Sequence, residues 1–294
     1  MIKQQCGDSS SALVGWEKGK KKYQEDYYGV YSKENRVLFA IADGIGGHSW
    51  GHLASRWMVE ELVKAFLENK NAAEMFRCGV ERAVSRMAAY QQNMGCTFTA
   101  SVIEQVQAKF KLSYSWIGDS RLYLLSSNIT NKIPPGAKEI SRTKNQVFWL
   151  LTEDDSFVWG FLQKGELTLD QVTQHPDKAY LELSVHPGQK NLSKLAERRA
   201  KTINIDKDDS VFLCTDGIWE TYSRQSKIMA HLNDKGPIVK IKQHLQKSKH
   251  EGILEDDGTF IYAKAREGIF KARCSPPEQY PYNKNPGGTC FKIT

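Results

Sequence analysis

Short apolar runs recur along the chain, and some of them end directly at an acidic residue. Residues 37–42 (VLFAIA) have the length and composition of a buried strand, and this strand leads straight into Asp43. Residues 211–214 are a second such strand, placed just before Asp216. Further strands are expected at 97–104, 110–117, 122–125 and 259–263, with Gly118 and Asp119 forming a turn between two of them.

Other stretches have the spacing of amphipathic helices. Apolar side chains recur at every fourth position from Ala54 to Phe66, with charged residues on the opposite side. This pattern predicts a helix over residues 51–68. Helices are also expected over 72–92, over 224–249 with a break at Gly236-Pro237, and over most of the polar segment 153–201, with Thr168 as an N-cap and a basic helix at 192–200.

Strands that follow one another in runs, with helices in pairs between them, indicate an α+β or layered α/β/β/α domain rather than alternating βαβ units. The polar residues 1–14 are expected to form a flexible N-terminus, and Pro134-Pro135-Gly136 predicts a loop within 129–145. Residues 266–294 hold four of the nine prolines and few apolar residues, which predicts a tail outside the core. The folded domain should therefore span residues 15–265.

The composition excludes several classes of protein. The net charge is +7, but the basic residues are dispersed and carry no nucleic-acid-binding motif, so no nucleic-acid partner is expected. No apolar stretch approaches the roughly 20 residues that span a bilayer, and the N-terminus lacks the apolar core of a secretory signal. The six cysteines include no C-x-x-C pair, which argues against zinc ribbons and disulfide frameworks. A cytoplasmic protein with reduced thiols and no membrane contact is expected.

Acidic residues at four places along the chain are candidate metal ligands. Carboxylates placed where buried strands emerge are costly unless a positive charge neutralises them. Divalent cations such as Mg2+ or Mn2+ supply that charge and prefer oxygen ligands, which a fold can gather from distant segments. The candidate acids are Glu25-Asp26, Asp43, Asp216 and Asp256-Asp257.

Seven motifs, in their order and spacing, resemble the metal-dependent serine/threonine protein phosphatases, the PPM or type 2C family. They cover about residues 15–265, and the DGIGGH form of one motif resembles bacterial members. A single motif would be a weak signal, whereas seven in family order are specific. The motifs are GKKKYQED at 19–26, ADGIGGH at 42–48, GCT at 95–97, GDSR at 118–121, LTEDDS at 151–156, CTDGIWE at 214–220 and EDDGT at 255–259.

The resemblance implies a four-layer α/β/β/α sandwich, in which two central antiparallel sheets are flanked by helix pairs. It also implies two bound ions, Mn2+ or Mg2+, and a third ion that is held more loosely. The segment 153–201 would be a flap beside the active site that tunes substrate choice.

The resemblance also assigns metal ligands. Asp43 would bridge two ions, and the carbonyl of Gly44 would bind one of them. Asp216 and Asp256 would hold the other ion. The glycines after Asp43 would let the backbone approach an ion closely, because a Cβ would obstruct it; an ordinary glycine-rich turn is the alternative.

The remaining implied ligands act less directly. Glu25 and Asp26 would act mainly through water molecules held by the metals. Asp119 matches the position that helps to hold the third ion. Alternatively, Asp119 caps its turn and Arg121 beside it forms an ordinary surface ion pair.

Lys21 and His48 are candidate catalytic residues. Lys21 stands where family members have an arginine that grips the substrate phosphate, and a lysine lacks the bidentate fork of that arginine. Lys21 is also one of four lysines between positions 18 and 22, a pattern typical of a solvated surface. His48 closes the glycine turn, where it could act as a general acid for the leaving alkoxide or stabilise the turn.

Two further departures from the family pattern add acids. Asp155 stands where a histidine is common, and Asp257 stands where an asparagine usually follows the last metal-binding aspartate. An additional carboxylate at 257 could strengthen cation binding or raise the pKa of its neighbour. Neither change removes an expected metal ligand.

These features predict metal-dependent hydrolysis of phosphoserine and phosphothreonine monoesters in proteins by a metal-activated water. The substrates would be phosphorylated proteins, the opposing partner a serine/threonine kinase, and the protein itself a monomer. One alternative is a catalytically silent family member that acts as a regulatory binding module, which Lys21 favours. Another is a metal-dependent hydrolase of small phosphoesters.

Overall fold

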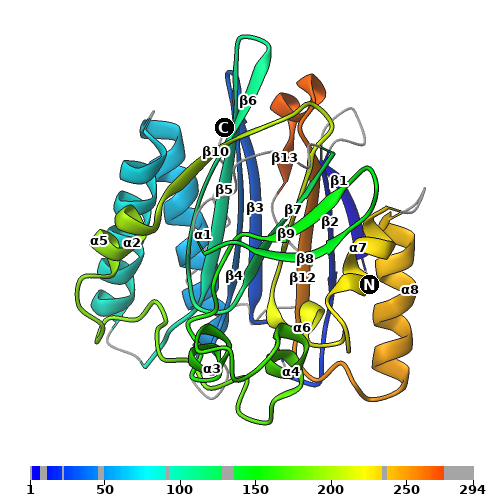
Figure 1. The fold of residues 1–294 in the computed structure, drawn as a ribbon. Helices are drawn as coiled ribbons and strands as arrows, with labels where there is room; N and C mark the ends of the chain where they lie inside the picture. Colours follow the sequence, from blue (N-terminus) through cyan, green and yellow to red (C-terminus); the bar gives the residue numbers. More distant parts are fainter. Residues whose placement is uncertain are drawn as a thin grey trace.

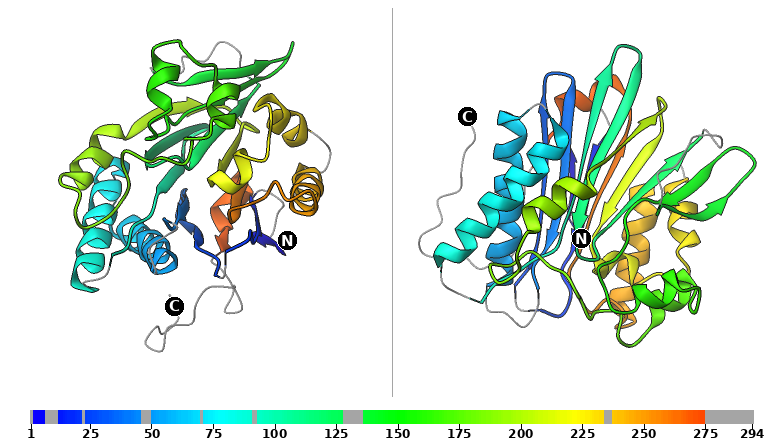
Figure 2. Two further views of the ribbon diagram at one scale, coloured as in Figure 1. Left: turned by 90° about the horizontal axis from the view of Figure 1, so that it is seen from below. Right: turned by 60° about the vertical axis from the view of Figure 1, so that its left-hand side comes forward.

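A computed structural model describes residues 2–6, 12–21, 23–45, 50–69, 71–90, 93–127, 136–233 and 237–274. Two antiparallel β-sheets lie face to face, and helices cover the outer face of each sheet (Figure 1). The views from below and from the side show the same four layers (Figure 2). The predicted α/β/β/α sandwich is therefore confirmed.

The two sheets draw their strands from both halves of the chain. The seven-stranded sheet has the order β1-β2-β12-β11-β7-β9-β8, and the six-stranded sheet has the order β10-β6-β5-β4-β3-β13. The first consists of β1 (Ile2–Cys6), β2 (Ala12–Glu17), β12 (Gly258–Lys264), β11 (Ser210–Cys214), β7 (Arg121–Ser126), β9 (Val147–Leu150) and β8 (Lys138–Arg142). The second consists of β10 (Lys201–Ile205), β6 (Lys109–Ile117), β5 (Phe98–Val106), β4 (Arg36–Asp43), β3 (Asp26–Lys33) and β13 (Arg273–Cys274).

The helices form two outer layers and a group at one end of the molecule. Helices α1 (Gly51–Glu68), α2 (Ala72–Tyr90) and α5 (Leu192–Arg199) lie on the side of the six-stranded sheet (Figure 1). Helices α7 (Ser226–Leu232) and α8 (Pro237–His250) cover the seven-stranded sheet. The short helices α3 (Trp159–Gln163), α4 (Leu169–Gln174) and α6 (Asp216–Trp219) lie at the lower end in Figure 1, and the 3-10 helix η1 (Glu267–Lys271) follows β12.

The layers explain why strand β4 is apolar at every position between its ends. Successive side chains of a strand point to opposite faces of the sheet. Phe39 belongs to the hydrophobic core between the two sheets, whereas Leu38 belongs to the core between the six-stranded sheet and its helices. Both faces of β4 are therefore buried, and an uninterrupted apolar run is the result. A third core lies between the seven-stranded sheet and α7 and α8, and Phe212 and Ile241 belong to it.

Elements with a strong local pattern were predicted correctly. The strand expected at 37–42 is β4, and the helix expected over 51–68 is α1. Thr168 is the N-cap of α4, where its hydroxyl accepts a hydrogen bond from the Gln171 amide as part of a capping box. Among the described residues, every helix is too short or too polar to cross a lipid bilayer.

Several expectations about irregular segments were wrong. Within the expected flexible N-terminus 1–14, residues 2–6 form strand β1 and residues 12–14 begin strand β2, and residues 138–142 form strand β8 within the expected loop. Residues 267–271 and 273–274 form η1 and β13 within the expected tail. The segment 153–201 was expected to be mostly helical, but it holds only three short helices, α3, α4 and α5. Three of these strands, β1, β8 and β13, lie at a sheet edge, where one side lacks a partner strand and polar residues are tolerated.

Candidate metal centre

Four acidic residues that are distant in sequence meet at one end of the two sheets. Asp26 begins β3, Asp43 ends β4, and the two residues are direct partners across these antiparallel strands. Asp216 follows β11 and Asp256 precedes β12, and these two strands are also antiparallel neighbours. The antiparallel pairing therefore brings each pair of acids to the same strand ends, beside helix α6 (Figure 1).

Electrostatics show that the acids from the two sheets form one cluster. Burial raises the pKa of the Asp43 carboxyl well above its usual range, and repulsion by Asp216, Asp26 and Asp256 raises it further. The pKa of Asp216 is also raised, by removal from water and by repulsion from Asp256 and Asp119. Like charges this close to one another destabilise the ionised cluster unless cations neutralise it.

Two carboxylate oxygens of the cluster are buried and have no hydrogen-bond partner within the described residues. They are Oδ1 of Asp43 and Oδ1 of Asp26. The other oxygen of Asp26 accepts a hydrogen bond of 2.9 Å from the Thr215 hydroxyl. A buried, unpaired carboxylate oxygen is costly, and an all-oxygen set of donors matches Mg2+ or Mn2+. The residues present therefore fit a divalent cation.

Gly44 is required by a close approach of two backbone segments. A Cβ at this position would lie 2.3 Å from the backbone carbon of Gly51, at the start of α1. The Gly44 amide donates a 3.1 Å hydrogen bond to the Glu25 carbonyl. Gly44 is therefore packed between the start of α1 and the Glu25 backbone. Gly46, Gly47 and the predicted catalytic residue His48 lie outside the described residues.

Asp119 belongs to the cluster through its position next to α6. Its backbone carbonyl accepts a 3.0 Å hydrogen bond from Nε1 of Trp219. Burial raises the pKa of Asp119 to about 8, and repulsion by Asp154 and Glu220 contributes. Because Asp119 in turn raises the pKa of Asp216, the two carboxyl groups lie close enough to repel each other.

Arg121 does not form the surface ion pair considered for it. Its side chain is fully buried and makes a two-bond contact with Asp154, with nitrogen–oxygen distances of 3.0 and 2.6 Å. Its guanidinium also lies 3.7 Å from the ring centre of Trp219. Arg121 therefore fixes the indole that contacts Asp119.

The Lys21 ammonium lies among the candidate metal ligands. It is 2.8 Å from Oε2 of Glu25 and 2.7 Å from Oδ1 of Asp256. Within the described part of the chain, no three Asp, Glu, His or Cys side chains already surround a common point as metal ligands would. Two of the expected ligands, Glu25 and Asp256, are paired with this lysine instead.

Asp257 holds the loop that carries Lys21. Its two carboxylate oxygens accept hydrogen bonds of 2.8 Å each from the backbone amides of Gly19 and Glu25. Burial raises the pKa of Asp257 to about 6. Burial raises the pKa of Asp26 well above its usual range, and repulsion by Asp257 adds to this shift. The hydrogen bonds to the Gly19 and Glu25 amides give Asp257 a role in shaping the loop.

Sequence reasoning missed Glu220. It lies one helical turn after Asp216, a spacing that places both side chains on the same face of α6 and could have identified it. Its pKa is raised by burial, and one of its oxygens is buried without a hydrogen-bond partner in the described residues. The other oxygen is 3.0 Å from Nζ of Lys178. Lys178 belongs to segment 153–201, so this segment reaches the acidic cluster.

Asp155 connects the same segment to the Gly118-Asp119 turn. Its carboxylate accepts two hydrogen bonds from Arg199, of 2.6 and 2.7 Å, and one of 2.9 Å from the Gly118 amide. The residue found where a histidine is common in the family thus fixes the turn that presents Asp119.

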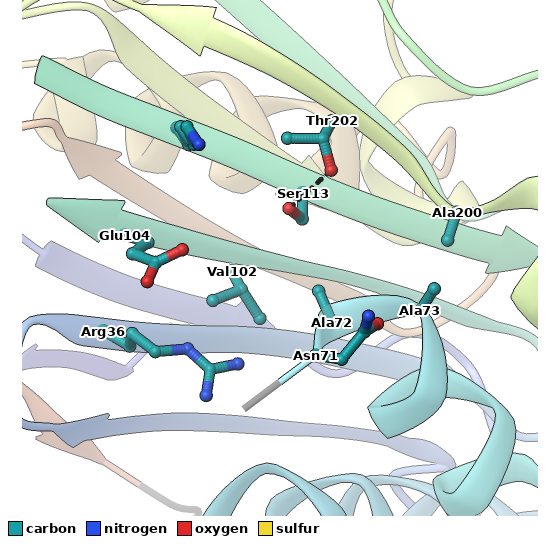
Figure 3. Close-up of a pocket in the computed structure, with 10 residues that line it drawn as sticks. Arg36, Asn71, Ala72, Ala73, Val102, Glu104, Ser113, Ala200 and Thr202 are labelled. Atoms are coloured by element: carbon teal, nitrogen blue, oxygen red, sulfur yellow. Dashed lines mark hydrogen bonds between the residues drawn. The ribbon is translucent and has the colours of Figure 1, made fainter. Parts of the chain in front are cut away.

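A hollow of about 320 Å3 lies elsewhere on the six-stranded sheet. Figure 3 shows Arg36 and Glu104 on one side of it, and Ser113 hydrogen-bonded to Thr202 at 2.8 Å on the other. Arg36 begins β4 and Asp43 ends it, so about 23 Å of extended strand separate the hollow from the carboxylates. The hollow is therefore not the acidic site.

Comparisons with known proteins agree with this geometry. Residues 18–247 match the family described as Protein phosphatase 2C. The chain is 27% identical over 211 residues to the serine/threonine phosphatase Stp of Listeria welshimeri, covering 67% of this chain and 73% of that protein.

Solved structures share the fold. The serine/threonine phosphatase Stp1 of Staphylococcus aureus aligns over 90% of this chain and 98% of its own, with a TM-score of 0.64 and 21% identity. The catalytic domain of the phosphatase PstP in complex with two manganese ions aligns over 86% of this chain and 96% of its own, with a TM-score of 0.58 and 22% identity.

Proposed function

This chain belongs to the protein phosphatase 2C family and is a metal-dependent serine/threonine phosphatase, and we propose that its acidic cluster is the catalytic metal centre. The observation that carries the assignment of the site is the meeting of Asp43, Asp216 and Asp256 from two sheets. Their mutual repulsion and the unpaired oxygen of Asp43 are relieved by bound cations.

We propose two divalent cations: Asp43 would help to hold both, the Gly44 carbonyl would bind one of them, and Asp216 and Asp256 would hold the other. Mn2+ and Mg2+ both fit the oxygen donors, and the manganese-containing PstP structure supports Mn2+. Glu25 and Asp26 would act from the edge of the centre. Bound cations would supply an activated water and neutralise the charge of the phosphoryl group.

The residues around the cluster hold its ligands in place. Trp219 binds the carbonyl of Asp119, which keeps a further carboxylate beside Asp216 for a third cation. Lys178 reaches Glu220 from segment 153–201, which supports our proposal that this segment is a flap next to the centre. Its residues would contact the peptide around the phosphorylated side chain and so influence substrate choice.

We propose phosphorylated proteins as substrates, with a serine/threonine kinase as the opposing enzyme. The curated relative in Listeria is a serine/threonine phosphatase by name, which favours this class over small phosphoesters. Lys21 would assist by meeting the substrate phosphate, and His48 would act as the general acid or hold its turn. A monomer in the cytoplasm remains the expected state.

The assay is phosphate release from a phosphothreonine peptide with and without Mn2+. We expect activity with Mn2+, none with EDTA, and a loss of at least about 100-fold for Asp43→Asn, since removing a ligand shared by two cations disrupts both. Glu104→Gln, which removes a carboxylate in the remote hollow, is the matched control and should retain activity. Mn2+-independent turnover, or full activity of Asp43→Asn, would disprove the proposed centre.

The same experiment separates the alternatives. A silent binding module would capture phosphopeptides without turnover under any metal condition. A small-phosphoester hydrolase would turn over metabolite esters faster than every phosphopeptide in a panel.

A further inference from the structure

Lys21 contacts the carboxylates of two proposed metal ligands at the same time. Its ammonium is 2.8 Å from Glu25 and 2.7 Å from Asp256, and its side chain is only 25% exposed. Burial alone would lower the pKa of the Lys21 ammonium, but the negative charges of Asp43 and Asp256 outweigh it and raise that pKa. A single ammonium is thus surrounded by acids from the β3, β4 and β12 ends of the cluster.

The backbone holds Lys21 in this position. Asp257 accepts hydrogen bonds from the amides of Gly19 and Glu25, which lie on either side of Lys21 in the sequence. The Lys20 amide donates a 2.9 Å hydrogen bond to the Glu255 carbonyl, and a Cβ at Gly19 would lie 2.4 Å from the backbone of Asp256. Gly19, Lys20 and Glu25 are therefore packed directly against residues 255–257.

An ammonium and a divalent cation compete for the same carboxylate oxygens. Each oxygen of Glu25 or Asp256 that pairs with Nζ of Lys21 is less available to a metal ion, and binding the ion requires these ion pairs to break. Two positive charges cannot share these oxygens at ion-pair distance without strong repulsion. The lysine and the ion are alternatives at this edge of the centre.

We propose that Lys21 is a tethered cation that neutralises Glu25 and Asp256 before metal binding and is displaced when a divalent cation loads. This displacement rests on the proposed function in one respect, namely that Glu25 and Asp256 help to hold the ion. Lys21 therefore stabilises the metal-free protein and weakens the affinity for metal. Once displaced, its ammonium remains on the same loop, within reach of a phosphate bound at the centre.

The experiment measures metal binding rather than activity. The proteins are stripped with EDTA and dialysed, and Mn2+ is then titrated by isothermal calorimetry into wild type, Lys21→Met, Lys21→Gln and Lys21→Arg. Lys20→Met is the matched control, because Lys20 pairs at 3.1 Å with Glu255, a residue outside the proposed ligand set. Melting temperatures are recorded with EDTA and with saturating Mn2+.

We expect the two uncharged variants at position 21 to bind Mn2+ about tenfold more tightly than wild type, because two partly exposed ion pairs no longer have to be broken. With EDTA both should melt at a lower temperature than wild type, and with Mn2+ this deficit should shrink. Lys21→Arg and Lys20→Met should stay within about twofold of wild type in Mn2+ affinity, since each keeps the charge that pairs with Glu25 and Asp256.

The outcomes separate this inference from the proposed function. Unchanged or weaker Mn2+ affinity in folded Lys21→Met and Lys21→Gln overturns the role of Lys21 but leaves the metal centre intact. An absence of Mn2+ binding in every variant, wild type included, overturns the proposed centre itself. If both uncharged variants fail to fold even with Mn2+, Lys21 is needed in the metal-loaded protein too, and displacement is refuted.

Discussion

The buried pair of Arg121 and Asp154 allows a quantitative test of how the scaffold supports the metal centre. Both side chains are almost completely buried, and two hydrogen bonds of 3.0 and 2.6 Å join them. Asp154→Asn removes the negative charge and replaces one acceptor oxygen with an NH2 donor that faces the guanidinium; the remaining partners are neutral, namely the Asn carbonyl oxygen, Gln225 at 3.1 Å and the Tyr123 hydroxyl at a longer distance. Removing one member of a buried ion pair costs about 3–5 kcal/mol.

This loss is large relative to the stability of a typical domain, about 5–15 kcal/mol. Urea unfolding, followed by tryptophan fluorescence with EDTA present, measures the change. With a slope of about 3 kcal/mol per molar urea, the midpoint for Asp154→Asn should fall by at least about 1 M. The exposed pair of Arg82 and Glu68 provides the control, because Glu68→Gln should cost no more than about 1 kcal/mol.

The same substitution should weaken the metal centre. Arg121 packs on Trp219, which binds the Asp119 carbonyl, and Trp219 shares helix α6 with Asp216. A looser Trp219 should reduce Mn2+ affinity in Asp154→Asn but leave it unchanged in Glu68→Gln. A stability loss below about 1 kcal/mol for Asp154→Asn would refute the reasoning, because the guanidinium would then have found another partner.

Three further predictions follow from individual contacts. The pKa of Asp119 is raised from 3.8 to about 8 in the folded protein, so the metal-free protein loses stability as pH rises between these values. The melting temperature with EDTA should therefore fall from pH 6 to pH 8, less steeply in Asp119→Asn; a rise for wild type would contradict this. Asp155→Asn should lower the free energy of unfolding by about 1–2 kcal/mol and weaken Mn2+ binding, because it weakens the ion pair with Arg199 and the hydrogen bond from the Gly118 amide. An unchanged urea midpoint together with an unchanged Mn2+ affinity would count against this role. Thr168→Ala should lower the free energy of unfolding by about 1 kcal/mol because the N-cap of α4 is lost, whereas Thr168→Ser should stay close to wild type. Equal urea midpoints for wild type and both variants would exclude a capping role.

Elements with a complete local pattern could be predicted from the sequence. The apolar run at 37–42 predicted β4, because burial on both faces makes every position apolar. Apolar residues at every fourth position predicted α1, because burial against one layer imposes the period of a helix. Strand β8 has no such pattern: it lies at the edge of its sheet, and none of its residues is fully buried. Its pairing with β9, rather than its own composition, makes it a strand.

The candidate metal ligands could be named from the sequence because their motifs are short and their chemistry is local to each motif. The strand pairing places Asp43, Asp216 and Asp256 at neighbouring strand ends, and the charges of Asp216 and Asp256 raise the pKa of Asp43; their role as metal ligands stays a proposal. The ion pair of Lys21 with Asp256 could not be predicted from the sequence, because Asp256 lies on a segment more than 200 residues away.

The sequence by itself determined the strands with uninterrupted or strongly apolar runs (β4, β5, β6, β7, β11 and β12), the long helices, and which acids stand beside apolar runs. The tertiary structure alone decided which charge neutralises which: Lys21 with Glu25 and Asp256, Arg121 with Asp154, and Asp155 with Arg199. The physical reason is the separation along the sequence over which each effect acts. Backbone periodicity and burial act within a few residues, whereas an ion pair depends on the distance between two side chains, which is set only when the sheets and loops have packed.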